Sequence, residues 1–354
     1  MQLILVINPG STSTKLALFD NHKLFKDIVI RHNDVDLKSF NTIIDQLTFR
    51  KKIILEFLKE NNVTIDQLKA IVARGGLLKP IAGGTYLINQ TMVNDLKAET
   101  YGSHASNLGG LLAYKLTTNT QIPAFIVDPV VVDELADIAR VSGSALINRK
   151  VIFHALNQKA VARRYAQSIN KSYNDLSLIV CHMGGGITIG WHNHGKVVDV
   201  NDGLGGDGPF SPERAGGVPS FSLIDICYSN KFSKNDLKKQ LVGKGGLYSY
   251  LQTSNVRDIE ARANNGDKKA IFYLEAMCYQ IAKEIGGLYF IANGRIDQLI
   301  ITGGLAYSKF IMKCLENYLQ GIISYTVYPG EDEMQALVDG ALRVLNKEEQ
   351  AKQY

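Results

Sequence analysis

The stretch "INPGSTSTK" at residues 7–15 directly follows the apolar run "LILV" at residues 3–6. An apolar strand that ends in Pro-Gly and continues into hydroxyl side chains predicts a β-hairpin with a polar turn, because these are turn-forming residues. The sequence "TKLALFD" at residues 14–20 supplies the returning strand. The chain therefore opens with strand, turn and strand, and small polar side chains occupy the turn.

The turn has the composition of a loop that can hold a phosphate group. Gly10 lets the backbone turn closely, and Ser11 and Ser13 offer hydroxyl and N–H donors. Lys15 supplies a cation. A Walker-type loop needs Gly directly before the Lys, which this turn lacks. Taken alone, a turn of this kind is more often a solvated hairpin than a ligand site.

A second turn, made only of glycines, strengthens the interpretation that these turns bind phosphate. "CHMGGGITIG" at residues 181–190 places Gly184–Gly186 between two apolar strands. Such a turn exposes backbone donors and admits a phosphate without a side-chain clash, although a tight hairpin without a ligand would look the same. One such turn in each half of the chain favours a phosphate chain held between two domains. "ITGG" at residues 301–304 adds a third strand ending in glycines, which suits a nucleoside.

"GLGGDG" at residues 203–208 satisfies the pattern GxGxxG. A dinucleotide-binding fold needs that pattern between a strand and a helix. Pro209 and Pro212 follow here and prevent such a helix from starting, so we reject the dinucleotide interpretation. We interpret the segment as a glycine-rich active-site loop that carries Arg214. The carboxylates beside it are Asp202, Asp207 and Glu213.

For each of the remaining charged motifs, the sequence allows a ligand-binding role and a purely structural role. Arg74 in "VARGG" and Arg214 in "PERAGG" flank glycines, where an arginine can bind carboxylate or phosphate in a forked geometry or simply face solvent. "YPGEDEM" at residues 328–334 concentrates carboxylates that can hold Mg²⁺ or begin an acidic helix. His192 and His194 lack an evident third ligand, so a metal pair is disfavoured.

Composition limits the class of protein. The chain has 354 residues, 45% of them hydrophobic, which predicts two domains with sizeable cores. The net charge is +5 and the basic residues are scattered, so we expect no nucleic-acid partner. The four cysteines lie far apart, which favours reduced thiols in the cytoplasm over a disulfide framework or a zinc ribbon. The sequence shows no signal-peptide pattern and no membrane-length apolar stretch, so we expect neither secretion nor a membrane span.

The strand-turn-strand layout recurs at residues 177–200, and helices alternate with strands after each copy. We therefore predict an α/β fold of two related halves facing a cleft. The first domain is expected to comprise residues 1–150, closed by a C-terminal helix at residues 331–354, and the second residues 151–330. "PAFIVDPVVV" at residues 123–132 is expected to be a buried strand. Long helices are expected at residues 41–62, 104–120, 150–169, 267–293 and 332–350.

An ordered set of motifs closely resembles the acetate and butyrate kinase family over nearly the whole chain. The motifs are "LVINPGSTSTKLALF", "VARGGLLKP", "HASNLGG", "FIVDPVVVDEL", "CHMGGGITIG" and "ITGGLAYS". "RGGLLKPIAGGTY", "VDPVVVDEL" and "PFSPERAGGVP" are most similar to the butyrate kinase branch, and the chain is shorter than is usual for acetate kinases.

The resemblance implies the superfold of acetate and sugar kinases, Hsp70 and actin, with two duplicated actin-like (ribonuclease H-like) α/β domains and a nucleotide cleft between them. It implies ATP or ADP, Mg²⁺ and reversible in-line phosphoryl transfer to a short-chain fatty acid, giving butanoyl phosphate from butyrate. Acetate, propionate or branched-chain acids are alternative substrates, and an actin- or Hsp70-like ATPase acting on protein partners is the alternative from another class. The family also implies at least a homodimer.

The family's motifs assign site residues position by position. Those that match its two phosphate hairpins are Asn8, Ser11, Ser13, Lys15, His182, Gly184, Gly185 and Gly186. Gly303 and Gly304 complete the expected nucleotide-binding set. The catalytic matches are Arg214, His154 and Asp128, with His104 in the substrate segment. Glu333 matches the metal-associated glutamate, with Glu331 and Asp332 as neighbouring candidates, and Asp128 is expected to assist the metal through water.

The chain departs from acetate kinases at informative positions. Gln158 replaces the second histidine of the family's "FHGTSH", and Gly185 replaces the asparagine of "HLGNG". Arg74 stands where acetate kinases have a histidine, and Ile71 where they have an arginine. On chemical grounds alone, we assign Arg74 to the substrate carboxylate and count it among the expected catalytic residues. These changes argue against acetate as the preferred substrate.

Overall fold

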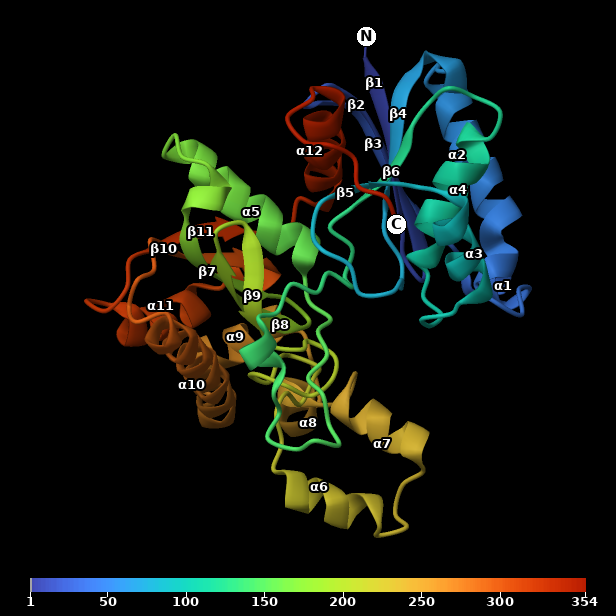
Figure 1. Cartoon of the computed structure of the whole chain (residues 1–354). Coiled ribbons are helices and arrows are strands. Elements are labelled where there is room, and N and C mark those ends of the chain that lie inside the picture. Colours follow the sequence, from blue (N-terminus) through green and yellow to red (C-terminus); the bar gives the residue numbers. More distant parts are fainter. Residues whose placement is uncertain (1) are drawn as a thin grey trace. The chain divides into compact units, whose positions relative to one another are not determined.

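The apolar opening run forms β1 (Leu3–Pro9), the strand around which the first sheet is built. In the computed structural model, which describes residues 2–354, the chain divides into two units (Figure 1). Unit 1 comprises the chain up to Asp133 together with Asp332–Tyr354, and unit 2 comprises Glu134–Glu331.

Unit 1 contains a six-stranded sheet in the order β3-β2-β1-β4-β6-β5. β1 pairs antiparallel with the next strand and parallel with β4, so that Ile7 lies between Leu16 and Ala73. All seven residues of β1 are buried, which explains why its sequence is a continuous apolar run and not an alternation. The remaining strands are β2 (Ser13–Asp20), β3 (Lys23–Arg31), β4 (Leu68–Arg74), β5 (Thr85–Leu87) and β6 (Ala124–Val127).

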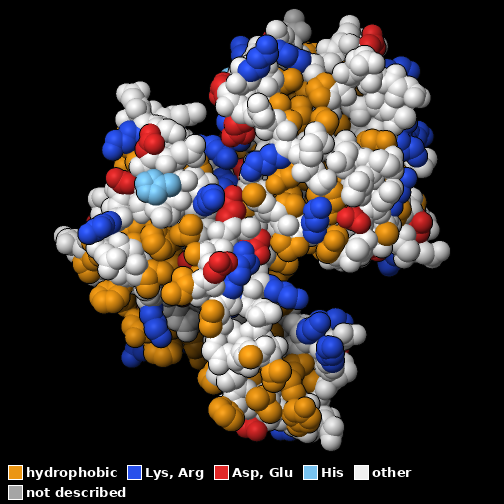
Figure 2. Space-filling view, viewed as in Figure 1, with side chains coloured by type: hydrophobic (Ala, Val, Ile, Leu, Met, Phe, Trp, Pro, Cys, Tyr) orange, Lys and Arg blue, Asp and Glu red, His pale blue; other side chains and the backbone are white. Residues whose placement is uncertain are grey.

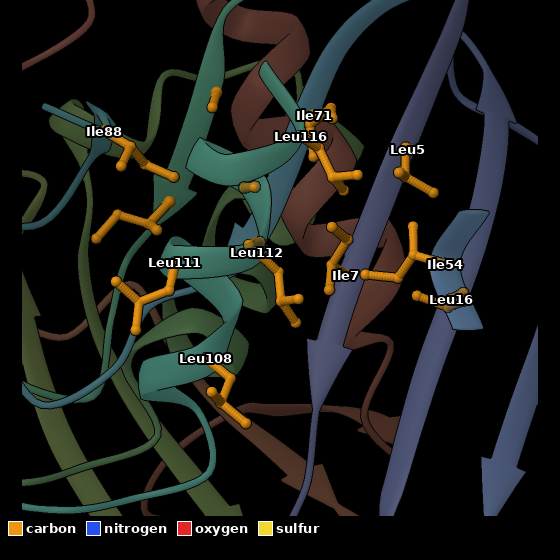
Figure 3. Close-up of a cluster of buried hydrophobic side chains, with 14 of the residues drawn as sticks. Leu5, Ile7, Leu16, Ile54, Ile71, Ile88, Leu108, Leu111, Leu112 and Leu116 are labelled. Atoms are coloured by element: carbon orange, nitrogen blue, oxygen red, sulfur yellow. The ribbon is translucent and has the colours of Figure 1, made fainter. Parts of the chain in front are cut away.

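Helices cover both faces of this sheet (Figure 1). α4 packs on one face of β4 and β6, and α12 packs on the other face of the same strands. Figure 3 shows the core on the α4 side, where Leu5 and Ile7 of β1 meet Leu112 of α4 and Ile54 of α2. The helices of unit 1 are α1 (Asp34–Lys38), α2 (Leu47–Glu60), α3 (Gln90–Ala98), α4 (Asn107–Thr117) and α12 (Glu333–Leu345).

Unit 2 repeats this arrangement in a five-stranded sheet of order β11-β10-β7-β8-β9. β7 pairs antiparallel with β8 and parallel with β10, as β1 does with β2 and β4. The expectation of two α/β halves with the same order of elements is therefore confirmed. The strands are β7 (Ser177–Met183), β8 (Ile187–Asn193), β9 (Lys196–Val200), β10 (Gln298–Gly303) and β11 (Tyr325–Pro329).

Two helix layers enclose the second sheet as well. α5 (Ala155–Ser168) packs on the face that carries Leu178 and Val180. α10 (Lys268–Ile291) and α11 (Lys309–Leu319) pack on the opposite face, against Ile179 and Cys181. α8 (Gly246–Leu251) and α9 (Val256–Asn264) complete this second layer. Within residues 2–354, no helix combines the length and the apolar character that crossing a bilayer requires.

α6 (Ser220–Cys227) and α7 (Lys234–Leu241) form an arm of unit 2 that the sequence did not lead us to expect. No residue within either helix is buried. Hydrophobic side chains gather on this arm in Figure 2, and Phe221, Ile224 and Tyr228 are among its exposed residues. The arm therefore adds surface to unit 2 without adding to its core.

Residues 134–149 lie in unit 2, whereas the sequence placed them in the first domain. Glu134 forms an ion pair with Lys159 of α5, with 2.8 Å between Oε2 and Nζ, and both side chains are buried. Arg149 forms ion pairs with Asp199 and Asp207, each at 3.1 Å. These charged contacts attach the segment to the second sheet, and no local sequence pattern reveals them.

The predicted helices and the predicted strand are shorter in the structure than expected, and two of them show a local reason. The helix expected from residue 150 begins at Ala155, because the backbone before it is irregular and Ile152 accepts a hydrogen bond from the Gly203 amide at 2.9 Å. The strand expected over residues 123–132 ends at Val127, because Asp128 takes a left-handed φ of 36°.

One prediction concerns the helix glycines. A Cβ on Gly109 of α4 would lie 2.4 Å from the Arg74 carbonyl oxygen, whereas a Cβ on Gly286 of α10 would meet no atom within 4 Å. Gly109→Ala should therefore destabilise the protein by about 1–3 kcal/mol through overpacking. Gly286→Ala should stabilise it by up to about 1 kcal/mol through helix propensity. Urea unfolding of both variants measures the two effects, and equal shifts for the pair would contradict this account of α4 packing.

Candidate functional site

The candidate residues of unit 1 lie where parallel strands end. β1 ends at Pro9, β4 at Arg74 and β6 at Val127, and these three strands are neighbours in the sheet. The carboxyl ends of parallel strands are the usual ligand-binding edge of an α/β sheet. Asn8, Arg74 and Asp128 thus come to one edge of the sheet from distant parts of the sequence.

The β1–β2 turn combines bonded and free backbone N–H groups. The Gly10 amide donates to the Ser13 carbonyl at 2.8 Å, and the His32 amide donates to the Thr12 carbonyl at 2.9 Å. Among the described residues, no acceptor is present for the Ser11 and Thr12 amides. Lys15 is exposed on β2, directly opposite Asn8. Free backbone donors of this kind are compatible with an anion-binding nest, and the phosphate-binding role assigned to this turn from the sequence stays a prediction.

Arg50 of α2 donates hydrogen bonds to the carbonyl groups of this turn, and we did not predict this role from the sequence. The residue is 0% exposed. Its Nη1 donates to the Ser13 carbonyl at 2.8 Å, and its Nη2 donates to the Ser11 carbonyl at 3.3 Å. Burial lowers the pKa of Arg50 to about 10, which leaves the guanidinium charged at neutral pH. A signal was present, because Arg50 lies at helical spacing from Ile54 and Phe57 on the buried face of α2.

Asn8 and Arg74 meet at Glu333, the first residue of α12. Asn8 Nδ2 donates to Glu333 Oε2 at 2.8 Å, and Arg74 forms an ion pair with Glu333 Oε1. The Glu333 side chain is 14% exposed and that of Arg74 is 30% exposed. The structure therefore brings together three of the predicted residues, with the carboxylate bound to arginine.

Asp128 and His104 each take part in local structure. Asp128 is 1% exposed, and its Oδ1 accepts a hydrogen bond from the Gly84 amide at 2.6 Å. His104 Nδ1 accepts from the Ser106 amide at 3.2 Å, just before α4. Desolvation, followed by the charge of Arg74, lowers the pKa of His104, so this imidazole is neutral at pH 7. The roles assigned to both residues from the sequence stay predictions.

In unit 2, the turn at Gly184–Gly186 joins β7 to β8. The Gly184 amide donates to the Gly186 carbonyl at 2.9 Å, which closes a tight turn. The ring of His182 stacks on that of His154, with 3.7 Å between centroids and 12° between planes. His154 Nδ1 lies 2.9 Å from Thr188 Oγ1. The two histidines predicted from separate motifs are therefore in direct contact beside this turn.

His182 is fixed by two further groups. It is 0% exposed, and its Nδ1 lies 2.8 Å from Asn157 Oδ1. Its Nε2 lies 3.1 Å from Glu331 Oε1, although the angle does not satisfy hydrogen-bond geometry. Glu331, which the sequence proposed as a neighbouring metal candidate, is thus placed against an imidazole of unit 2.

Arg214 lies against the tip of this glycine turn. A Cβ on Gly186 would be 1.9 Å from Arg214 Nη1, so only glycine leaves room for the guanidinium. Arg214 Nη1 donates to the Gly203 carbonyl at 2.8 Å, while its Nε is buried and finds no acceptor among the described residues. Burial lowers the pKa of Arg214, against the opposing charges of Glu213 and Asp202. An arginine with an unsatisfied buried donor is suited to bind an anion.

Ser211 positions the Arg214 turn and was not singled out from the sequence. Its hydroxyl donates to the Gly185 carbonyl at 2.6 Å and accepts from the Arg214 amide at 3.2 Å. The Ser211 hydroxyl thus links the loop around Arg214 to the glycine turn through these two hydrogen bonds.

Gly303 ends β10 beside the same turn. A Cβ on it would lie 2.3 Å from the Met183 carbonyl oxygen, and its φ is 90°. Gly304 is exposed, and a Cβ on it would meet no atom within 4 Å. The two glycines therefore differ, since close packing and left-handed backbone require the first, while the second leaves an open surface.

A cavity of about 570 Å³ adjoins Arg214 within unit 2. The glycine loop at residues 203–206 lines one part of it. Leu223 of α6 and Leu241 of α7 line another part, together with Ile152. Apart from Arg214, its charged lining residues are Asp202, Asp207 and Lys238. The cavity therefore offers apolar walls with an arginine at hand, which suits a small amphipathic anion.

The carboxylates proposed for metal binding already have protein partners. Among the described residues, no three His, Cys, Asp or Glu side chains come together as a metal site. Glu333 is bound to Arg74 and Asn8, and Asp128 to the Gly84 amide. This donor set fits a Mg²⁺ ion that is held mainly by a ligand's phosphates and reaches the protein through water.

His192 of β8, considered from the sequence together with His194 as a metal pair, has structural partners. Its Nδ1 lies 2.8 Å from the Tyr173 hydroxyl and its Nε2 lies 3.0 Å from Gln158 Oε1. Burial, followed by the charges of Lys159 and Arg163, holds the pKa of His192 well below its ordinary value. Its polar partners explain this buried imidazole without a metal.

Comparison with known proteins gives a consistent result. The sequence profile of the Acetokinase family matches residues 136–352. The fold is similar to an acetate kinase from Porphyromonas gingivalis, with a TM-score of 0.78 and 17% identity over 98% of this chain and 100% of that chain. It is similar to a propionate kinase from Francisella tularensis subsp. tularensis SCHU S4, with a TM-score of 0.74 and 20% identity over 96% and 99% of the two chains.

A more distant likeness extends to a putative N-acetylmannosamine kinase from Listeria monocytogenes, with a TM-score of 0.54 and 15% identity over 98% of this chain and 100% of that chain. At such identities these likenesses show a shared fold. Together with the duplicated sheets, they place both units in the actin-like superfold that the sequence predicted.

Proposed function

Since this chain belongs to the Acetokinase family, phosphotransferases with a carboxyl group as acceptor, we propose that it is a butyrate kinase that converts butyrate and ATP reversibly into butanoyl phosphate and ADP. The observation that carries the proposal is the position of Arg214. This residue lies against the bare turn at Gly186 and also lines the apolar cavity. One guanidinium can thus contact a phosphoryl group and the carboxylate of an acid whose hydrocarbon chain occupies the cavity.

The protein needs to contribute little covalent chemistry to this reaction. A carboxylate is already a deprotonated nucleophile, so no general base is required. The protein must align the attack on the γ-phosphoryl group and neutralise the charge that develops on it. Arg214 supplies a fixed positive charge for this purpose, because Ser211 and the Gly203 carbonyl hold it in place.

His154 assists from the same unit. Its stacking on His182 and its hydrogen bond to Thr188 fix the plane of its imidazole beside the glycine turn. In our proposal it contacts the moving phosphoryl group. The backbone donors of Gly185 and Gly186 bind the nucleotide phosphates, and the hydrogen bond from the Gly184 amide closes the turn that carries them.

In unit 1, the Ser11 and Thr12 amides of the β1–β2 turn and the cation of Lys15 bind phosphate oxygens, with Asn8 fixed beside them. Glu333 and Asp128 would hold Mg²⁺ through waters, and the ion, when bound, supplies charge neutralisation to the phosphates. Both half-sites are required for turnover in this proposal. The expected nucleotide cleft between the domains stays a prediction.

The cavity beside Arg214 supports an acid longer than acetate. Its volume of about 570 Å³ is within the range of small-molecule pockets and exceeds what an acetyl group fills. Leu204, Leu223 and Leu241 among its lining residues can bury methylene groups, each worth about 0.8 kcal/mol. Propionate and branched-chain acids fit the same description and are the alternatives within the enzyme class.

A hydroxamate assay for acyl phosphate, with Mg-ATP and a series of two- to six-carbon acids, tests the proposal directly. A butyrate kinase gives its highest kcat/KM at four carbons. An actin- or Hsp70-like ATPase would release phosphate from ATP without forming hydroxamate from any of the acids. A homo-oligomeric state and a cytoplasmic location, expected from the sequence, remain part of the proposal.

Arg214→Ala should lower kcat for butyrate by about 10²–10³-fold, because one preorganised positive charge at the transition state is lost. ADP binding, measured by calorimetry, should persist. Arg257→Ala on α9 is the matched control, since that arginine is exposed in the same unit, and it should leave kcat unchanged. Near-normal turnover of Arg214→Ala would refute the assigned role.

Leu223→Trp should fill part of the cavity and raise KM for butyrate more than KM for acetate, by about tenfold in the ratio, because the longer chain loses space that the shorter one does not need. Phe221→Trp on the same helix is the control, since Phe221 is 84% exposed. An unchanged ratio of KM values in Leu223→Trp would place the acyl chain elsewhere.

A further inference from the structure

Arg50 is a charged side chain in the protein interior, where charged groups are rarely found. It is among the largest fully buried side chains of the protein. Among the side chains that the structure describes, no carboxylate forms an ion pair with it. Its five hydrogen bonds all go to neutral oxygens, which belong to Ser11, Ser13, Thr14 and Gln46. A buried charge without a counter-ion is unfavourable, so its retention calls for a physical reason.

The contacts of Arg50 orient the β1–β2 turn. The Ser11 and Ser13 carbonyls accept from Arg50, and the Thr12 carbonyl accepts from the His32 amide. The Ser11 and Thr12 amides, by contrast, have no acceptor among the described residues. The guanidinium is within hydrogen-bond distance of the Ser11 and Ser13 carbonyls, so its charge lies next to the turn. The turn thus combines these amide donors with a buried cation beside them.

We propose that Arg50 supplies the fixed positive charge that makes the β1–β2 turn bind the phosphates of the nucleotide, and that the bound phosphates act as its missing counter-ion. The inference rests on the proposed function, which brings a nucleotide to this turn. Arg50 acts through the turn and is therefore a positioning and electrostatic residue that does not touch the substrate. The ligand class is a polyphosphate anion.

Gln46 offers a way to remove the charge without removing the contacts. Its Oε1 accepts from Arg50 Nη2 at 2.8 Å and from Nε at 3.1 Å, a two-pronged geometry that a carboxylate would also satisfy. Gln46→Glu would therefore neutralise Arg50 in place and keep the hydrogen bonds to the turn. A purely structural Arg50 would gain from this change, because a buried ion pair replaces an unpaired charge.

The experiment measures Mg-ADP binding to the full chain by calorimetry, together with KM for ATP and for butyrate. Gln46→Glu should weaken ADP binding and raise KM for ATP by about tenfold or more, with KM for butyrate unchanged and the melting temperature equal to or above that of the wild type. Thr48→Glu is the matched control, since Thr48 is exposed on the same turn of α2 and an added charge there leaves Arg50 unpaired. It should bind ADP as the wild type does.

The outcomes separate the inference from the proposed function. Unchanged ADP binding in a folded Gln46→Glu variant overturns the inference while leaving the kinase proposal intact. A wild-type protein that does not bind ADP overturns the kinase proposal itself. If Gln46→Glu does not fold, Arg50→Lys, which keeps the positive charge, is compared with Arg50→Gln, which removes it at a similar side-chain size. Equal ADP affinities of these two variants overturn the inference as well.

Discussion

One buried strand in each unit joins an antiparallel hairpin to a parallel neighbour. β1 pairs with β2 on one side and with β4 on the other, and β7 does the same with β8 and β10. This pairing forces a tight turn and the carboxyl end of a parallel strand to lie side by side. Every group to which we assign phosphate chemistry lies on such a turn, at such a strand end or in the residues packed against them.

The two units use the same topology with different chemistry. In unit 1, the turn carries hydroxyl residues and is held by the buried Arg50. In unit 2, the turn is bare, and Arg214 lies against its tip in the space that Gly186 leaves open. The first arginine is enclosed by protein, while the second retains an unsatisfied donor. A duplicated scaffold thus holds one cation for support and another for contact with a ligand.

Much of the fold could be predicted from the sequence, because its signals are local. The β1–β2 and β7–β8 hairpins follow from apolar runs that flank turn residues. The resemblance of short motifs to a known family supplied most of the proposed site residues. Contacts between distant segments could not be predicted in this way. Arg50 lies 36 residues from Thr14, and its helical spacing with Ile54 indicates burial without naming a partner. Glu134 likewise joins unit 2 through a buried pair with Lys159 that no local pattern encodes.

The arm formed by α6 and α7 has a consequence for how the cavity beside Arg214 behaves. Leu223 and Leu241 belong both to the cavity lining and to helices that bury no residue of their own. Segments with few buried contacts open locally at far lower free energy than a sheet core does. One wall of the cavity can therefore yield while the sheet beneath it stays folded. Under the proposed function, the site is rigid at Arg214, where charge must be placed, and compliant at α6 and α7, where the hydrocarbon chain would lie.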